Sequence, residues 1–213
     1  MGVSGASTVG ILASGRGSNM EAILDAVQAG RLPLRPGVVV SNRPAARALE
    51  VARERGVPAV FVDPKPFGPD REGYDRELVR VLQAHGVDLV ALAGYMRLVT
   101  PAFLTAFPGR VLNVHPSLLP AFPGLNAQAQ ALAYGVKVSG CTVFFVDDGV
   151  DTGAILLQAA VPVQDGDTEA TLAARILEQE HRLFPGALGL VATGQFRLDG
   201  RRVTRLATIS EEG

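Results

Sequence analysis

The chain has 213 residues, of which 47% are hydrophobic, and this is enough apolar material for one domain with a core or at most two small ones. Its formal net charge is −1 at pH 7 and no basic run occurs in it, so a nucleic acid is not an expected partner. Cys141 is the only cysteine, which excludes an intrachain disulfide and a thiolate metal cluster. Its apolar neighbours predict a buried core residue rather than a nucleophile.

The first residues and the hydropathy of the chain indicate where in the cell the protein is expected. No positive charge precedes the short apolar run at 8–13, and no apolar stretch reaches the roughly 20 residues that cross a membrane. We therefore expect a cytoplasmic protein that contacts no membrane. We also expect a single domain over residues 1–213 with residues 1–7 flexible, while the choice between a monomer and a homodimer stays open.

Strand-like and helix-like segments alternate through the first half of the chain. The apolar runs predict strands at 8–12, 37–42, 59–63, 87–94 and 110–115. Helical periodicity follows the first three of them, at 18–28, 44–56 and 70–86. The strands show little polar alternation, as expected where helices cover both faces of a sheet. This order predicts an α/β fold with a doubly wound, mainly parallel, Rossmann-like sheet.

The second half has a different pattern. Two strand-like runs, CTVFFVDDG and ILLQAAVPV, flank a loop rich in Gly and Asp. A long helix is expected from Thr168 to Phe184, and the segment RLDGRRV, with Asp199 and Gly200 at its turn, predicts a terminal hairpin.

The loop after the first strand, SGRGSN, carries two glycines before a helix. Gly17 lets the backbone approach a ligand, and the unpaired N–H groups of a helix N-terminus suit a phosphate. Ser18 and Glu21 also fit a capping box, which would explain them without any ligand. The loop lacks the Gly-Lys-Ser/Thr of a Walker loop, and Met20 replaces the third glycine of a dinucleotide fingerprint. A monophosphate site and a plain helix cap both remain open.

Only one of the three histidines, His115, stands at the C-terminal end of a predicted sheet strand, where open α/β sheets bind their ligands. Asn113 points to the same face, because side chains in strands repeat every two residues. A carboxylate from the following acidic loop is expected to pair with His115, unless that loop is simply a solvated turn. The spacing does not choose among Asp147, Asp148 and Asp151.

Glu180 falls four residues after Ile176, on the apolar stripe of the last long helix. A carboxylate in that position must reach a polar partner or a wet cleft. The alternative, that Glu180 lies at the edge of the stripe, is equally open.

Several segments together resemble the phosphoribosylglycinamide formyltransferases, a family of folate-dependent enzymes of de novo purine synthesis. The resemblance runs in order over residues 9–203, through SGRGSN, AGYMRLV, LNVHPSLLPAFPG, GCTVFFVDDGVDTG and the QEH of the last helix. The HPSLLP segment also resembles methionyl-tRNA formyltransferase and formyltetrahydrofolate hydrolase, whereas the early loop, the short chain and QEH favour the purine enzyme.

The resemblance implies roles for the matched residues. The N-terminal half would bind the ribonucleotide, and the C-terminal half would bind the folate and carry out catalysis. The ribonucleotide contacts would be Gly17, Ser18, Asn19 and Glu180. The folate would contact Arg71, Met96, Arg97, Leu98, Val99, Asn113 and Asp147. The catalytic residues would be Asn113, His115 and Asp151.

The implied reaction passes the formyl group of the co-substrate 10-formyltetrahydrofolate to the amine of glycinamide ribonucleotide, and it needs no metal. His115, paired with Asp151, and Asn113 would donate hydrogen bonds to the oxyanion that forms. A hydrolase, which passes the group to water, is expected to add an N-terminal regulatory domain, and a tRNA formyltransferase a basic C-terminal one. A non-catalytic binding module would lack His115 or Asp151.

Three positions depart from the family pattern. Phe144 stands where the family usually has His, and Gln128 and Ala129 stand where His and a charged residue are common. We expect these changes to affect substrate positioning more than the reaction itself.

Overall fold

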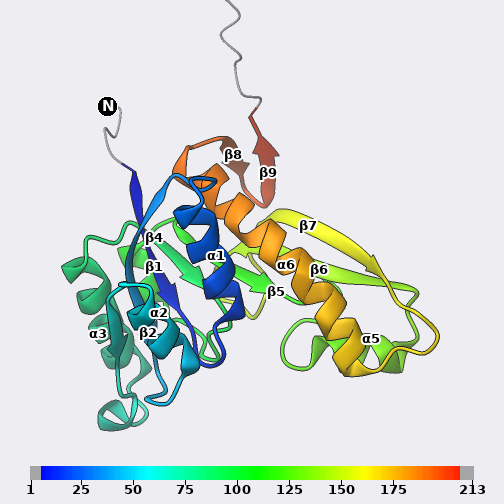
Figure 1. The fold of residues 1–213 in the computed structure, drawn as a ribbon, viewed down its shortest axis with the longest axis horizontal. Coiled ribbons are helices and arrows are strands. Elements are labelled where there is room, and N and C mark those ends of the chain that lie inside the picture. Colours follow the sequence, from blue (N-terminus) through cyan, green and yellow to red (C-terminus); the bar gives the residue numbers. More distant parts are fainter. Residues whose placement is uncertain (1–5, 207–213) are drawn as a thin grey trace, which may run out of the picture.

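The computed structural model describes residues 6–206, and its main feature is a seven-stranded sheet in the order β3-β2-β1-β4-β5-β6-β7 (Figure 1). The strands of this sheet are β1 Ser7–Leu12, β2 Leu34–Ser41, β3 Ala59–Phe61, β4 Leu89–Leu92, β5 Val111–His115, β6 Val138–Phe145 and β7 Ile155–Pro162. A second, two-stranded sheet pairs β8 Phe196–Asp199 with β9 Arg202–Arg205. The terminal hairpin predicted around Asp199 and Gly200 is therefore confirmed.

Helices follow most of the strands. They are α1 Ser18–Gln28, α2 Arg47–Glu54, the short 3₁₀ helix η1 Lys65–Phe67, α3 Arg71–Ala84, α4 Pro101–Ala106, α5 Ala127–Tyr134 and α6 Glu169–Ala192. Within the described residues, no helix is both long and apolar enough to span a membrane.

Strands β1 to β5 are parallel, whereas β6 and β7 are antiparallel to their neighbours. The predicted doubly wound, mainly parallel sheet is thus confirmed. Leu12 pairs with Leu92, and Leu92 pairs with Asn113, so the C-terminal ends of β1, β4 and β5 lie side by side. The loops that follow these three strands therefore meet at one edge of the sheet.

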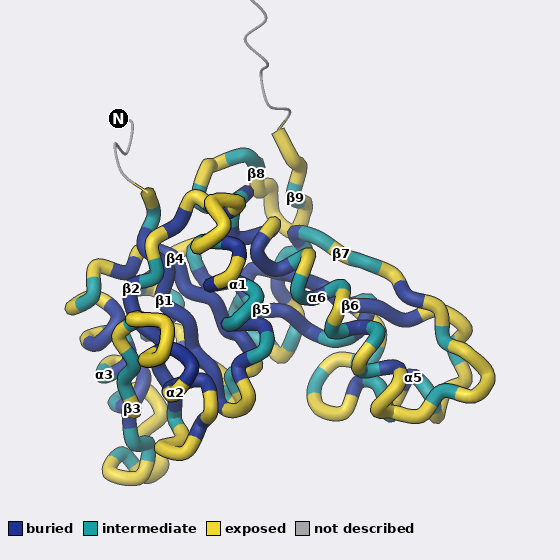
Figure 2. Tube along the Cα trace, in the orientation of Figure 1, coloured by how far each residue is buried: buried dark blue, intermediate teal, exposed yellow. Residues whose placement is uncertain are grey.

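Each face of the sheet has its own hydrophobic core. Side chains of α1, α2 and α6 fill one core, for example Ile23, Leu49 and Ile176. The other core lies under α3 and α4 and includes Leu78 and Phe103. The inner strands β1, β4 and β6 are almost continuously buried (Figure 2), which explains why their sequences show little polar alternation, whereas the edge strands β3 and β7 are partly exposed.

The last helix, α6, is longer than predicted. It continues through Pro185 to Ala192 rather than ending at Phe184. Proline lacks the N–H that would bond to the carbonyl four residues earlier, so local rules predict a stop there. Here Phe184, Ala187 and Leu188 are fully buried in the core, and this burial holds the helix together across the missing bond.

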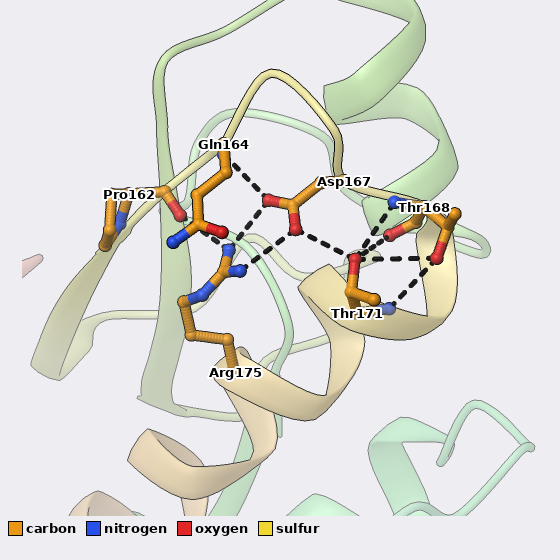
Figure 3. A network of polar contacts seen from close by, with 6 residues as sticks. All are labelled: Pro162, Gln164, Asp167, Thr168, Thr171 and Arg175. Carbon is orange, nitrogen blue, oxygen red and sulfur yellow. Dashed lines mark hydrogen bonds and ion pairs between the residues drawn. The ribbon is translucent and has the colours of Figure 1, made fainter.

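A polar network fixes the start of α6 relative to β7 (Figure 3). Thr168 and Thr171 form a capping box at the helix N-terminus. Asp167 receives two hydrogen bonds from Arg175, of 2.7 and 2.9 Å, and Arg175 also donates to the carbonyl of Pro162 at the end of β7. Arg175 holds the pKa of the Asp167 carboxyl below its usual range. The network sets the axial position of α6, and hence of Glu180 three turns later.

The N-terminal segment differs from the expectation in part. Residues 1–5 of the stretch expected to be flexible lie outside the described residues. Ser7 begins β1, where it pairs with Leu34 of β2.

Candidate functional site

The loop after β1 enters α1 at Gly17, which has a left-handed φ of 83°. A Cβ atom added there would lie 2.8 Å from the Cβ of Ala48, so both backbone and packing require glycine. The capping box, one of the two alternatives left open for Ser18 and Glu21, is wrong, because Gly17 occupies the N-cap position, Ser18 is already helical, and no side chain caps the helix. The Glu21 carboxylate instead pairs with Arg47 at 3.0 Å. The first N–H groups of α1 are left without a cap, which suits an anion.

Asn19 and Glu180 meet in the interior beside this loop. The Asn19 side chain donates a 2.7 Å hydrogen bond from Nδ2 to Oε2 of Glu180, and both residues are buried. Glu180 therefore lies within the apolar stripe and not at its edge. Burial raises the pKa of the Glu180 carboxyl, and the bond from Asn19 offsets part of that rise. The Oδ1 atom of Asn19 is buried without a partner among the described residues, so this pair retains an unused acceptor.

His115 ends β5 as predicted, and only 5% of its surface is exposed. Its Nδ1 atom lies 3.3 Å from Oδ2 of Asp151, and its Nε2 atom lies 2.8 Å from the carbonyl oxygen of Phe122. Of the three candidate carboxylates, the structure thus brings Asp151 to the histidine. Because both ring nitrogens face acceptors, a doubly protonated ring can donate to both.

The two acceptors that face His115 sit on strained backbone. Phe122 and Asp151 both have φ of 54°, in the left-handed region. Such residues cost on the order of 1–3 kcal/mol each and persist only where surrounding contacts hold them. Oδ2 of Asp151 also accepts a 2.7 Å hydrogen bond from the N–H of Gly124, which ties the two loops together. The Phe122 carbonyl is a site feature that sequence reasoning missed, because no local pattern indicates it.

Asn113 is half-buried on β5 and pairs with Phe144 of β6. Directly opposed residues in an antiparallel pair share one face of the sheet, so the Phe144 ring flanks Asn113. Phe144 is 1% exposed. Phe144, which departs from the family pattern, therefore forms an apolar surface that excludes water next to β5, the strand that carries His115.

Asp147 does not approach the histidine in the same way. Its Oδ1 atom accepts hydrogen bonds from the N–H of Gly149 at 3.2 Å and from the hydroxyl of Thr152 at 2.7 Å. The side chain thus folds the loop that presents Asp151, and the structure gives it a local bonding role.

The loop between β4 and α4 exposes large apolar side chains. Met96 is 60% and Leu98 is 54% exposed, and exposed apolar side chains close together on one loop are typical of a binding surface. Helix α3 holds this loop from the other side. Arg71 donates to the carbonyl of Leu98 at 3.0 Å, and buried Asp75 accepts from the N–H of Thr100 at 2.6 Å. Burial raises the pKa of the Asp75 carboxyl.

The remaining predicted positions of this loop are Arg97 and Val99. The guanidinium of Arg97 lies over the ring of Tyr74, 4.8 Å from its centroid, which is a cation–π arrangement. Val99 is 7% exposed and packs in the core under α3 and α4. The loop is therefore anchored through its backbone and through Val99, while Met96 and Leu98 point outward.

Ser14 is the second feature that sequence reasoning missed. It lies just after β1 and is 2% exposed. Its hydroxyl contacts Asn42 at 2.6 Å and the N–H of Met96 at 2.9 Å. The residue belongs to SGRGSN, and its place at the sheet edge was the only available signal.

The interior position predicted for Cys141 is confirmed. The residue is fully buried in β6, and burial raises the pKa of its thiol to about 12. Between residues 6 and 206, no three His, Cys, Asp or Glu side chains come together in a way that could hold a metal ion.

The chain matches the formyl transferase family over residues 8–188. It is 47% identical over 188 residues to the trifunctional purine biosynthetic protein adenosine-3 of Drosophila melanogaster, a match that covers 87% of this chain but only 14% of that protein. It is also similar to phosphoribosylglycinamide formyltransferases along most of their length. The identity is 41% to that of Escherichia coli, covering 91% of this chain and 94% of the relative, and 47% to that of Mycobacterium tuberculosis, covering 91% and 89%.

The solved structures that resemble this chain agree with the sequence matches. Glycinamide ribonucleotide transformylase 1 from Symbiobacterium toebii superposes with a TM-score of 0.93 at 57% identity, over 94% of each chain. A formyltetrahydrofolate deformylase from Pseudomonas syringae has a TM-score of 0.88 over 96% of this chain and 67% of its own, but at 23% identity this likeness concerns the fold alone. The chain therefore belongs to the formyl transferase family and, within it, to the phosphoribosylglycinamide formyltransferases.

Proposed function

We propose that this protein transfers the formyl group of 10-formyltetrahydrofolate to the amine of glycinamide ribonucleotide, a step of purine biosynthesis. The observation that carries the proposal is the pairing of buried His115, at the C-terminal end of β5, with partly buried Asp151, 3.3 Å away, in a chain of this family. The phosphoribosylglycinamide formyltransferases of Escherichia coli and Mycobacterium tuberculosis, which this chain matches along most of their length, support the same reaction.

The reaction can proceed without a covalent enzyme intermediate. The lone pair of the substrate amine forms a bond to the formyl carbon, and the carbonyl electron pair moves onto oxygen. The resulting oxyanion then re-forms the carbonyl and expels N10 of the folate, which takes up a proton, while the amine loses one. Catalysis requires hydrogen-bond donors at the oxyanion, and His115 and Asn113 are the candidates.

His115 can supply such a donor through Nε2. In this structure the Nε2–H group bonds to the carbonyl oxygen of Phe122. During the reaction it must give up this neutral acceptor and donate to the developing anion instead. The developing anion is a stronger acceptor than a neutral carbonyl oxygen, so the exchange favours the transition state. Asp151 accepts a hydrogen bond from Nδ1–H and holds the ring in place, which makes it a positioning partner for the donor.

The ribonucleotide phosphate would bind the uncapped N–H groups at the start of α1, in the segment Gly17, Ser18 and Asn19. Glu180, already bonded to Asn19, would accept hydrogen bonds from the ribonucleotide. These two proposed contacts, the start of α1 and Glu180, come from opposite ends of the chain. The proposed ribonucleotide site is therefore not confined to the N-terminal half.

The folate would lie against the exposed loop of Met96, Arg97, Leu98 and Val99. The outward apolar side chains of that loop offer a surface for a flat heterocycle, and its fixed backbone offers hydrogen-bonding groups. Arg71, at the rim of the loop, carries a positive charge suited to the acidic tail of a folate. Asn113 and Asp147 complete the proposed folate contacts.

We also propose that the enzyme works in the cytoplasm, as a monomer or a homodimer, and that it acts without a metal. Both substrates are small molecules, so no nucleic acid or membrane takes part.

Donor consumption tests the proposal against hydrolysis. Purified protein is mixed with 10-formyltetrahydrofolate, with and without glycinamide ribonucleotide, and the loss of the donor is followed. We expect rapid consumption only when the ribonucleotide is present. Equal consumption without it would identify a hydrolase, and no consumption in either mixture would contradict the proposed activity.

A further inference from the structure

Ser14 connects the two loops that the proposed function assigns to different substrates. It opens the segment SGRGSN after β1, and its main-chain N–H donates to the carbonyl of Gly94 at 3.1 Å, at the start of the loop after β4. Two residues further on, its hydroxyl accepts the N–H of Met96 at 2.9 Å. The residue thus holds the loop over residues 94–96 at two points.

The direction of these hydrogen bonds follows from chemistry. The N–H of Met96 can only donate, so it must point at a lone pair of the Ser14 hydroxyl oxygen. The hydroxyl proton is then directed elsewhere, and Oδ1 of Asn42 lies 2.6 Å away to accept it. Asn42 therefore sets the rotation of the hydroxyl that receives Met96.

The same loop is fixed at its far end by α3, through the bonds of Arg71 to Leu98 and of Asp75 to Thr100. Ser14 supplies the anchors at the near end. Between these anchors the side chains of Met96 and Leu98 remain largely exposed. A loop held at both ends with its apolar side chains outward is arranged for a ligand before the ligand arrives.

We propose that Ser14 is a positioning residue for the folate, acting through the backbone of Met96 with its hydroxyl oriented by Asn42. This inference rests on the proposed function, because it needs the loop of residues 96–99 to bind the folate. Ser14 lies at the start of the phosphate loop, yet its side chain points to the folate loop. Its loss should therefore weaken folate binding and leave ribonucleotide binding unchanged.

The test measures the dissociation constants of tetrahydrofolate, the product form of the donor, and of glycinamide ribonucleotide separately by calorimetry. In Ser14→Ala we expect the value for tetrahydrofolate to rise about tenfold, equivalent to about 1.4 kcal/mol, and the value for the ribonucleotide to change less than about twofold. Ser139→Ala is the matched control, since Ser139 is equally buried and its hydroxyl has no partner among the described residues. Both constants should stay at wild-type values in it.

Two variants of Asn42 separate the proposed role from general loosening of the protein. Asn42→Ala removes the acceptor for the Ser14 hydroxyl and should weaken tetrahydrofolate binding, by less than Ser14→Ala does. Asn42→Asp keeps an acceptor oxygen in the same place and should retain wild-type affinity. Equal loss of tetrahydrofolate affinity in Asn42→Ala and Asn42→Asp would contradict the role assigned to the Asn42 oxygen.

The outcomes divide clearly. If wild-type protein binds tetrahydrofolate but Ser14→Ala binds it equally well, the inference is wrong and the proposed function stands. If Ser14→Ala weakens both ligands to the same extent, Ser14 supports the fold and does not position the folate. If the wild-type protein binds neither ligand, the proposed function fails and the inference fails with it.

Discussion

Asn19 in the first turn of α1 donates a 2.7 Å hydrogen bond to Glu180 of α6, although 161 residues separate them in the chain. The bond joins the start of α1, where we propose that the ribonucleotide phosphate binds, to the last long helix, and both residues are buried. The sequence left open whether Glu180 lies inside the apolar stripe of α6 and which polar group it contacts. The structure places Glu180 inside the stripe and shows Asn19 as its partner. A buried carboxylate of this kind makes stability depend on pH.

Glu180→Gln tests that dependence. Burial raises the pKa of Glu180 above its ordinary value of 4.5, so the stabilisation is complete below that pH and is lost as pH rises through the folded-state pKa. Gln keeps an oxygen for Asn19 but does not ionise. We expect the difference in Tm, variant minus wild type, to increase as pH rises above 4.5 and then to level off. Thermal unfolding from about pH 4 to 8 measures it, with exposed Glu178→Gln as the control, and a difference that is constant across this range would contradict the prediction.

His115→Ala should lower kcat by on the order of 100-fold or more, because removal of one oxyanion donor typically has that effect. Binding of glycinamide ribonucleotide should remain, since the uncapped start of α1 and Glu180 do not depend on the imidazole. Steady-state kinetics and calorimetry measure the two quantities. His85→Ala is the control, because His85 caps the C-terminus of α3 and bonds to Val81 there. Turnover near the wild-type rate in His115→Ala would rule out the proposed donor.

Asp151→Asn should lower kcat by about 10- to 100-fold, since a hydrogen bond to a charged group is worth about 1.5–3 kcal/mol. The substitution suits the backbone, because Asn tolerates the left-handed φ of 54° found at this position. Asp148→Asn is the control in the same loop and should keep the wild-type rate. The pairing of His115 with Asp151 would lose its assigned importance if both variants behaved alike.

Inorganic phosphate should inhibit competitively against glycinamide ribonucleotide and not against 10-formyltetrahydrofolate, because the uncapped N–H groups at the start of α1 belong to the proposed ribonucleotide site and not to the proposed folate site. Gly17→Ala should weaken this inhibition and destabilise the protein by about 1–2 kcal/mol, since it places a Cβ on a left-handed residue against Ala48. Gly15→Ala, where the added atom meets nothing within 4 Å, is the control for stability. Competition against the folate alone would refute the loop assignment.

The sequence predicted those parts of the fold that depend on local pattern. Alternating apolar runs and helical periodicity indicated the doubly wound sheet, and the rule that ligands bind at the C-terminal edge singled out His115. The failures have a common cause, which is that distant contacts overrode local preference. Burial of Phe184 and Leu188 carried α6 past Pro185, and close packing against Ala48 placed the N-cap of α1 at a glycine.

The candidate site also divides into residues that the sequence predicted and contacts that it did not. Asn113, His115 and Glu180 could be selected from their positions on a strand or helix. The pairing of His115 with Asp151, the carbonyl of Phe122 beside Nε2 and the hydroxyl of Ser14 under Met96 depend on loop paths. Loop paths follow from long-range contacts, so residue spacing alone did not predict them, and only the family resemblance indicated Asp151.

The fate of the formyl carbon tests the central claim most directly. 10-Formyltetrahydrofolate labelled with carbon-13 in the formyl group is incubated with glycinamide ribonucleotide and the protein, and the label is followed by NMR. We predict that the label moves to the ribonucleotide amide with wild-type protein, and on the order of 100-fold more slowly with His115→Ala. Label that accumulates as formate, or that reaches the amide equally fast with His115→Ala, would contradict formyl transfer at this site.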